Sequence, residues 1–145
     1  MNNNGNIDAI INQLGFSIVE NIKTYKGRER NALISHIDKA LGVLVNDGVY
    51  AYYVFCKSKE KEDDKVKPYS KIFINDIVKE LKVYFNIKNN NLENTAQQNE
   101  GDEERYFFQN ISEDLHELLF FREVLERVLI YARYHAKALS GGKNE

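Results

Sequence analysis

The feature that most constrains this chain is an unbroken run of large apolar and aromatic residues near its middle. Residues Val49–Cys56 read Val-Tyr-Ala-Tyr-Tyr-Val-Phe-Cys, and they lie between the turn signal Asn46-Asp47-Gly48 and the cluster Lys57-Ser58-Lys59. If the run is a helix, both of its faces are apolar, so it must be covered on two sides, by this chain or by another. A β-hairpin with residues 43–45 is the alternative, because Asp-Gly between Val- and Tyr-rich segments is a hairpin signal.

Helical periodicity elsewhere in the chain favours the helix. Apolar residues recur every three or four positions in the segments on both sides of the run, which is the spacing of one helix face. We therefore predict an all-α fold, a compact helical bundle formed by one domain over residues 1–145. The apolar stripes extend from Ile7 to Tyr25, from Leu33 to Val45, from Phe73 to Phe85 and from Leu115 to Leu139.

The last of these segments has the best-marked ends. Ser112 or Asn110 can cap its start, acidic residues occupy its first turn, and Gly141-Gly142 follow its basic last turn. These features agree with the capping and dipole preferences of helices, so we predict a long C-terminal helix. Three polar segments are predicted to be non-helical: a flexible start at residues 1–6, a charged loop at 60–69, and an acidic loop at 87–104 that is exposed or disordered.

Composition limits the partners and the compartment. The net charge is −2, so any contact with nucleic acid has to come from local basic patches. Cys56 is the only cysteine and cannot form an internal disulfide, and the N-terminus lacks the pattern of a secretory signal. No apolar stretch is long enough to span a membrane. We predict a cytoplasmic protein without a membrane contact or a cofactor.

The sequence offers no convincing catalytic group. Cys56 lies in the apolar run, where a buried and inert thiol is expected. Glu113, His116 and Glu117 could share one helix face, but their number and spacing fall short of a metal site. We therefore predict no catalytic residue and no metal, and we keep an enzyme that uses these three residues with a metal as an alternative.

The aromatic run has two interpretations. Exposed rings could stack on single-stranded bases. Packing in the core or between subunits is favoured, because a run this apolar rarely stays exposed. We predict that Tyr50, Tyr52 and Phe55 lie at a subunit interface.

Basic residues form the second candidate surface. They can be a solvated face with ion pairs to neighbouring glutamates, or they can contact phosphates. Arg122 lies on the apolar side of its helix, so it is either paired inside the chain or placed against a partner. The candidate nucleic-acid-binding residues are Lys57, Lys59, Arg122, Arg127, Arg133 and Lys137.

Three segments share short motifs with one known family. Val19–Lys23 matches a Val-Glu-x-Val/Ile-Lys element. Ile37–Lys59 matches an asparagine-glycine turn and the helix after it, with Asp47 inserted in the turn. Phe121–Ala138 matches a terminal aromatic-Arg…Trp-Leu-Lys-Arg-Phe-Ala helix, with Tyr131 in place of the tryptophan. The chain thus resembles the small α-helical subunit of type III-B (Cmr-type) CRISPR RNA-targeting complexes, although its acidic loop at 87–104 is longer than expected.

The resemblance implies an all-α subunit that is not an enzyme. Copies of such a subunit pack in a row along the backbone subunits and line the groove that holds guide RNA paired with target RNA, while another subunit cuts. The resemblance therefore implies that the partners are other subunits of the effector complex, copies of itself, guide RNA and target RNA. The alternative is a small helical adaptor that binds protein and makes no contact with RNA.

Overall fold

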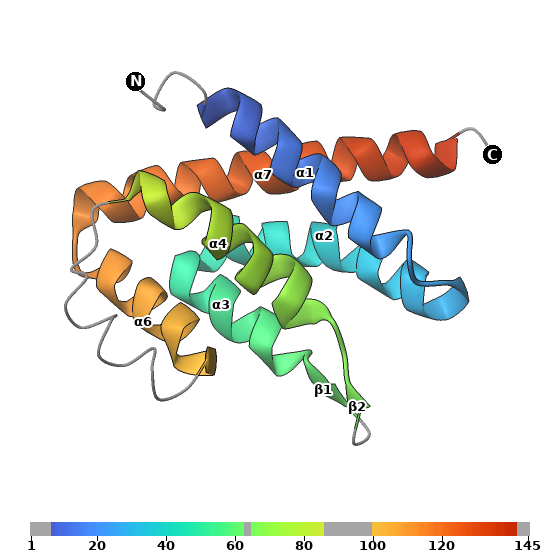
Figure 1. Cartoon of the computed structure of the whole chain (residues 1–145), viewed down its shortest axis with the longest axis horizontal. Coiled ribbons are helices and arrows are strands. Elements are labelled where there is room, and N and C mark those ends of the chain that lie inside the picture. Colours follow the sequence, from blue (N-terminus) through green and yellow to red (C-terminus); the bar gives the residue numbers. More distant parts are fainter. Residues whose placement is uncertain (1–6, 63–64, 86–99, 142–145) are drawn as a thin grey trace. The chain divides into compact units, whose positions relative to one another are not determined.

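The computed structural model describes residues 7–62, 65–85 and 100–141 (Figure 1). Nearly all of this part is helical, which confirms the predicted all-α fold, and the C-terminal helix α7 (Leu115–Gly141) is 27 residues long. The chain, which was predicted as one domain, divides into two units. The first unit combines Met1–Asp47 with Glu123–Glu145, and the second unit is Gly48–Arg122, so the division falls inside α7. The predicted flexible start, residues 1–6, lies outside the described residues.

The first unit contains three helical segments: α1 (Ile7–Ile22), α2 (Gly27–Asp47) and the part of α7 from Glu123 onward. Most residues of the apolar stripes that the sequence predicts on these helices become buried. Burial of such stripes against one another is the main stabilising term in a helical unit. The buried residues are Ile11, Leu14, Ile18, Val19 and Ile22 on α1, Leu33, Ile37, Ala40, Leu41 and Leu44 on α2, and Val124, Leu125, Val128, Leu129, Ala132 and Ala136 on α7.

The turn between α1 and α2 is closed by an arginine. Gly27 begins α2 with φ of 60°, a conformation that favours glycine. The Arg30 guanidinium donates hydrogen bonds of 2.9 Å to the carbonyl oxygens of Tyr25 and Lys23. Arg30 therefore satisfies carbonyl groups that the end of α1 leaves without helical partners.

The turn between α2 and α3 (Val49–Ser58) decides the ambiguity of the central run. Gly48 has φ of 102° and separates the two helices, and its carbonyl accepts the first hydrogen bond of α3, from Tyr52 N at 3.0 Å. The run is thus helical, and the hairpin alternative for residues 43–54 is excluded.

The second unit continues from α3 through short elements to α6 and the first turns of α7. The two-residue strands pair antiparallel, with Lys61 opposite Val66 and Glu62 opposite Lys65. The elements after α3 are β1 (Lys61–Glu62), β2 (Lys65–Val66), the π-helical turn η2 (Lys71–Asn75), α4 (Asp76–Leu81), the 3-10 turn η3 (Lys82–Tyr84) and α6 (Glu100–Ser112).

Two loop predictions need correction. The charged segment 60–69 contains the small β1–β2 ladder, because Lys67 N also donates to Glu60 O and brings the ends of the segment together. Residues 100–104, which were assigned to the acidic loop, are helical in α6. Polar composition hid this helix, since its apolar residues begin only at Tyr106. The rest of the predicted loop lies almost entirely in residues 86–99, outside the described residues.

Aromatic residues fill much of the interior of the second unit. Tyr52 is fully buried, and its hydroxyl donates a 2.6 Å hydrogen bond to the Phe73 carbonyl oxygen in η2. The rings of Phe107, Phe108 and Phe121 contact one another edge-to-face, with centroids 5.2 to 5.7 Å apart. Edge-to-face pairs add to the stabilisation that burial of the rings supplies.

The start of α7 is capped by a residue that the sequence analysis did not select. The Asp114 carboxylate accepts a hydrogen bond from Glu117 N at 3.2 Å. Ser112 instead donates to Phe108 O within α6, so neither Ser112 nor Asn110 caps α7. An aspartate at this position also places negative charge at the positive end of the helix dipole.

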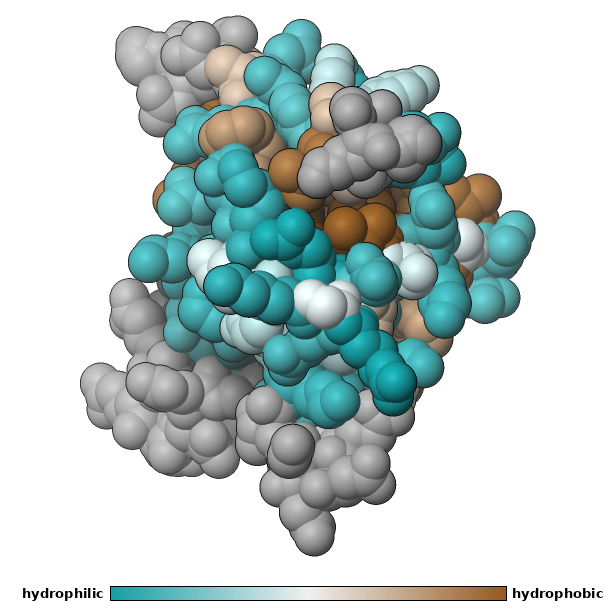
Figure 2. All heavy atoms as spheres, turned by 90° about the vertical axis from the view of Figure 1, so that its right-hand side faces the viewer, coloured by the Kyte–Doolittle hydropathy of each residue, from teal (hydrophilic) through white to brown (hydrophobic). Residues whose placement is uncertain are grey.

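Exposed apolar side chains occur in both units. Figure 2 shows a face on which hydrophilic residues cover most of the surface and apolar residues form small patches. None of the described helices combines the length and the apolar character that a membrane span requires. The most exposed large apolar side chains are Val83, Leu115, Leu119 and Val54 in the second unit and Tyr134 and Phe16 in the first. Such residues are candidates for contact with a partner.

Candidate functional site

Two of the candidate basic residues on α7 are held by aspartates of neighbouring helices. Arg127 Nη2 lies 3.0 Å from Asp8 Oδ1 on α1, and Arg133 Nη1 lies 3.7 Å from Asp38 Oδ1 on α2. Both aspartate side chains are more exposed (74% and 64%) than their arginines (40% and 39%). Ion pairs this exposed contribute about 0–1 kcal/mol, so a phosphate can replace the aspartate at little cost.

The Arg133 side chain has a second feature. Its Nε is buried and forms no hydrogen bond. A buried N–H without a partner is unfavourable, and a 3.7 Å ion pair at Nη1 does not satisfy it. Arg133 is therefore incompletely paired within the described part of the chain, and the unsatisfied group is the buried Nε, whereas its Nη1 is held by an exposed aspartate.

Lys137 lies one helical turn after Arg133 and is exposed. It forms no ion pair with any residue in the described ranges. Arg133 and Lys137 are four residues apart, so their side chains lie on the same side of α7. Arg127, Arg133 and Lys137 all belong to the first unit, and we call them the α7 cations.

The other three candidates belong to the second unit. Lys57 Nζ lies 3.1 Å from Glu60 Oε1, and the Lys59 ammonium lies 5.5 Å from the centre of the Phe55 ring. Arg122 is half-buried and is not a free side chain, which agrees with the internal pairing considered for it. The structure thus places Arg133 and Lys137 on one side of α7 and pairs Arg127 with α1. Lys57 pairs with Glu60, Lys59 lies over Phe55, and Arg122 also has a partner within the chain.

The predicted interface residues on α3 separate into buried and exposed positions. Tyr52 is fully buried and hydrogen-bonded, so the prediction that it lies at a subunit interface is wrong. Its position on the inner face of α3, with Val49, Tyr53 and Cys56, explains the burial. Tyr50 is 44% exposed, and Phe55 is half-buried beside Lys59, so both can still contact a partner.

The thiol of Cys56 is buried next to Tyr52. Burial raises the pKa of the Cys56 thiol far above its ordinary value, although the hydrogen bond with Tyr52 acts in the opposite direction. The group therefore stays protonated at neutral pH, and a protonated thiol is a poor nucleophile. The structure confirms the predicted burial of Cys56.

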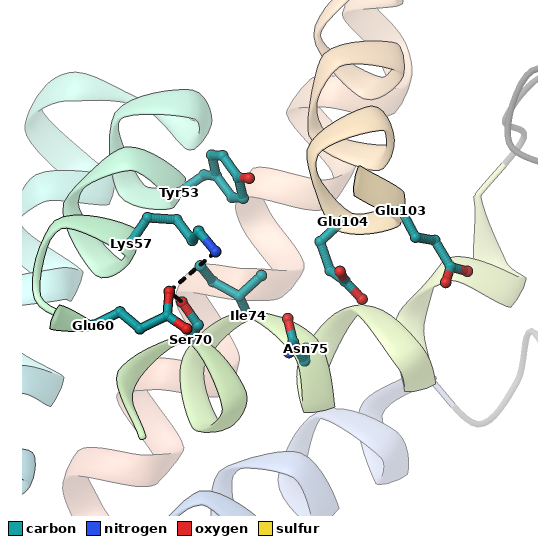
Figure 3. Close-up of a pocket in the computed structure, with 8 residues that line it drawn as sticks. All are labelled: Tyr53, Lys57, Glu60, Ser70, Ile74, Asn75, Glu103 and Glu104. Atoms are coloured by element: carbon teal, nitrogen blue, oxygen red, sulfur yellow. Dashed lines mark hydrogen bonds and ion pairs between the residues drawn. The ribbon is translucent and has the colours of Figure 1, made fainter. Parts of the chain in front are cut away.

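A cavity of about 380 Å³ lies in the second unit between α3, the η2–α4 segment and α6 (Figure 3). Ser70 Oγ donates to Glu60 Oε1 at 2.9 Å, and the same oxygen pairs with Lys57. Glu103 pairs with Lys82 Nζ at 2.6 Å. The cavity is lined by Tyr53, Lys57, Glu60, Ser70, Ile74, Asn75, Glu103 and Glu104.

Glu104 is a cavity carboxylate whose ionisation is perturbed. Burial raises the pKa of Glu104 above its ordinary value, and the neighbouring Glu103 adds to the shift, while a backbone hydrogen bond, Lys82 and Lys57 oppose it. Sequence reasoning missed the cavity because Glu60 was assigned to one loop and Glu103 and Glu104 to another. The helical register of α6 places Glu103 and Glu104 on the cavity wall, and Glu60 reaches it from the segment after α3.

The metal alternative gains no support from the geometry. Within residues 7–62, 65–85 and 100–141, no group of three or more His, Cys, Asp or Glu side chains is arranged to hold a metal ion. Glu113 and His116 are both exposed at the junction of α6 and α7. Glu117 is positioned through its backbone N–H on Asp114, as expected for the first turn of a capped helix.

Comparisons with known proteins identify no relative. Neither the profiles of protein families, nor the curated protein sequences, nor the solved structures contain a match to this chain.

Proposed function

We propose that this chain is a non-catalytic small subunit of a type III-B (Cmr-type) CRISPR ribonucleoprotein. In this proposal it packs along the backbone subunits and helps to hold guide RNA and target RNA in the cytoplasm. The three shared motifs described above supply the family. The RNA contact is supported by the pairing of the α7 cations: among the described residues, Arg127 and Arg133 pair only with exposed aspartates, and Lys137 has no ion pair.

The electrostatic argument favours exchange of partners at these arginines. A phosphate that replaces Asp8 or Asp38 offers the guanidinium a charge-assisted, bidentate hydrogen bond. The released aspartate returns to water with little penalty, because it is already mostly exposed. Contacts of this kind bind RNA without choosing a sequence, as a subunit that follows a variable guide requires.

A salt titration of RNA binding by the assembled complex tests the role of α7. We expect the double variant Arg133→Ala/Lys137→Ala to weaken binding and to reduce the slope of log K against log salt by roughly 0.7–0.9 for each lost phosphate contact. The matched control is Lys71→Ala/Lys79→Ala, which removes two exposed lysines from the second unit. An unchanged affinity and slope in the α7 variant would contradict the RNA contact.

Purification of the chain from its native host tests the assembly. The proposal predicts that CRISPR effector subunits and RNA co-purify with it. The second candidate function is a helical adaptor for proteins alone, which the exposed Leu115, Leu119 and Tyr50 favour. The adaptor predicts associated proteins, no associated RNA and no crosslink between RNA and this chain.

A further inference from the structure

In the first unit α1 crosses α7 (Figure 1), and three exposed aromatic residues belong to the segments around this crossing. Gly15 lies against the Tyr131 Cβ and against the α7 backbone at Val128 and Ala132, so the two helices approach closely there. Phe16 follows Gly15 on α1, and Tyr134 lies one turn after Tyr131 on α7. We call Phe16, Tyr131 and Tyr134 the crossing aromatics.

The crossing aromatics are exposed although rings of this size are usually covered. Their exposed fractions are 49% for Phe16, 36% for Tyr131 and 57% for Tyr134. A large ring left in water forgoes the stabilisation that burial would supply, so a group of three is an unused contact surface. By contrast, Tyr52 and Tyr53 of the central run, which were considered for base stacking, are buried.

One of these rings, that of Phe16, is held in place before any partner arrives. The His135 ring meets Phe16 edge-to-face, with centroids 5.4 Å apart, and His135 Nε2 lies 3.3 Å from Asn12 Oδ1. These contacts restrict the Phe16 ring, and the close helix crossing restricts the Tyr131 Cβ. Fixed rings lose little conformational entropy on binding.

The charges around the rings indicate the kind of partner. Arg127 lies one turn before Tyr131, and Lys137 lies three residues after Tyr134, so each cation is on the same side of α7 as that ring. Arg133 precedes Tyr134 in the chain and pairs with Asp38 of α2. Aromatic faces interleaved with exchangeable or unpaired cations match a polyanion that also carries flat apolar rings. Single-stranded nucleic acid has both properties, whereas a purely apolar protein surface carries no negative charge with which the cations could pair.

We propose that the crossing aromatics stack on unpaired bases of single-stranded RNA while the α7 cations contact its phosphates. The inference rests on the proposed function, in which α7 contacts RNA, and it adds that the bases themselves contribute to affinity. Stacking of this kind accepts every base, because each base has a π face. The contribution of the bases is therefore independent of the RNA sequence.

The test compares two probes of equal length and charge. Fluorescently labelled oligouridylate and an abasic oligoribonucleotide are titrated with the full chain, and binding is followed by anisotropy. We expect the abasic probe to bind roughly tenfold or more weakly, because base–aromatic stacking is lost while the phosphates remain. The chain contains nine tyrosines and no tryptophan, so quenching of tyrosine emission by oligouridylate supplies a second readout.

Substitutions test whether the preference for oligouridylate over the abasic probe comes from the crossing aromatics. Tyr134→Leu and Phe16→Leu should reduce the preference for oligouridylate, whereas Tyr134→Phe should keep it, because phenylalanine retains the π face. Tyr50→Leu is the matched control, since Tyr50 has similar exposure and belongs to the second unit. We expect its preference to equal that of the unaltered chain.

The outcomes separate this inference from the proposed function. Equal binding of both probes, with strong salt dependence, would overturn stacking and leave a phosphate contact in place. A preference that survives both leucine variants would overturn the assignment to the crossing aromatics. If neither probe binds the chain, the inference fails. The proposed function is then tested separately, by whether RNA co-purifies with the chain from its native host.

Discussion

Gly15 of α1 lies directly against Tyr131 of α7. A Cβ built on Gly15 would lie 2.7 Å from the Tyr131 Cβ, 3.0 Å from Ala132 N and 3.1 Å from Val128 O. Two of these three atoms belong to the backbone and cannot move aside as a flexible side chain can. The absence of a side chain at position 15 therefore permits the helix approach that builds the first unit and its aromatic surface.

Gly15→Ala is the first prediction. Alanine favours a helix over glycine by about 1 kcal/mol, but here the added methyl must push α1 away from α7. Overpacking of this kind costs about 1–3 kcal/mol, so we expect net destabilisation, measured by chemical denaturation. The control is Gly42→Ala in α2, where nothing lies within 4 Å of the added Cβ. Gly42→Ala should stabilise the chain, and a gain in stability for Gly15→Ala would contradict the close crossing.

The second prediction concerns the tyrosine that the structure removes from the subunit interface. Tyr52→Phe removes the 2.6 Å hydrogen bond to Phe73 O and leaves the ring in place. The expected loss is about 0.5–1.5 kcal/mol in the free energy of unfolding. Tyr50→Phe should change stability by much less, because Tyr50 is exposed. Equal effects of the two substitutions would argue against a buried, hydrogen-bonded Tyr52.

The third prediction follows from the ionisation of Cys56. Burial raises the pKa of Cys56 above its ordinary value of 9.0 and that of Tyr52 above 10.0. Both groups keep their protons in the folded chain at a pH where the unfolded chain loses them. Their contribution to stability is therefore complete below about pH 9 and decreases as the pH rises further. Thermal melts across this range should show the decrease, and Cys56→Ala should make it shallower.

Thiol chemistry checks the same burial independently. A thiol-specific reagent at neutral pH should leave Cys56 unmodified in the folded chain and react once denaturant is added, because only the unfolded chain exposes the thiolate-forming group. Rapid modification of the folded chain would contradict the buried position of Cys56.

The fourth prediction distinguishes two adjacent glutamates. Burial raises the pKa of Glu104 above its ordinary 4.5, so the folded chain prefers the protonated carboxyl. The stability that this preference supplies is present below about pH 4.5 and is lost as the pH rises through the raised value. At neutral pH the carboxylate is therefore unfavourable, and Glu104→Gln should raise the melting temperature at pH 7 but not at about pH 4.

Glu103→Gln is the matched control for Glu104→Gln. Glu103 pairs with Lys82 at 2.6 Å, so removal of its charge should lower the melting temperature at pH 7, by an amount corresponding to no more than about 1 kcal/mol. The two neighbouring substitutions should thus act in opposite directions. Effects of the same sign would contradict the interpretation that burial makes the Glu104 carboxylate unfavourable at neutral pH.

Local patterns predicted the helices well, because helix formation depends on spacing within a single segment. The periodicities of α1, α2 and α7 mark most of the residues that become buried, although Leu115 and Leu119 at the start of α7 stay exposed. Gly48 and Gly27 occupy turns where positive φ favours glycine. The helix at residues 100–112 was partly missed, since its first turns are polar and carry no periodic signal. Asp114 was overlooked as a cap because Asn110 and Ser112, both nearby, fit the same rule.

The candidate site depended more on tertiary structure. Sequence spacing identified Arg127, Arg133 and Lys137 as candidates, but it could not show that Asp8 and Asp38 pair with the two arginines, since those partners are about 100 residues away. The central run gave no indication that Tyr52 turns inward and Tyr50 outward.

By itself, the sequence determined an all-α chain, the positions of most helices and the residues able to carry charge or apolar contact. Those properties arise from interactions between residues three or four positions apart, which any single segment contains. Only the tertiary structure decided which aromatic rings remain exposed, which cations are paired, and where α1 meets α7. Such outcomes require contacts between distant segments. Gly15 is an example, because the lack of a side chain there allows α1 to approach α7 closely, and no local sequence pattern indicates this approach.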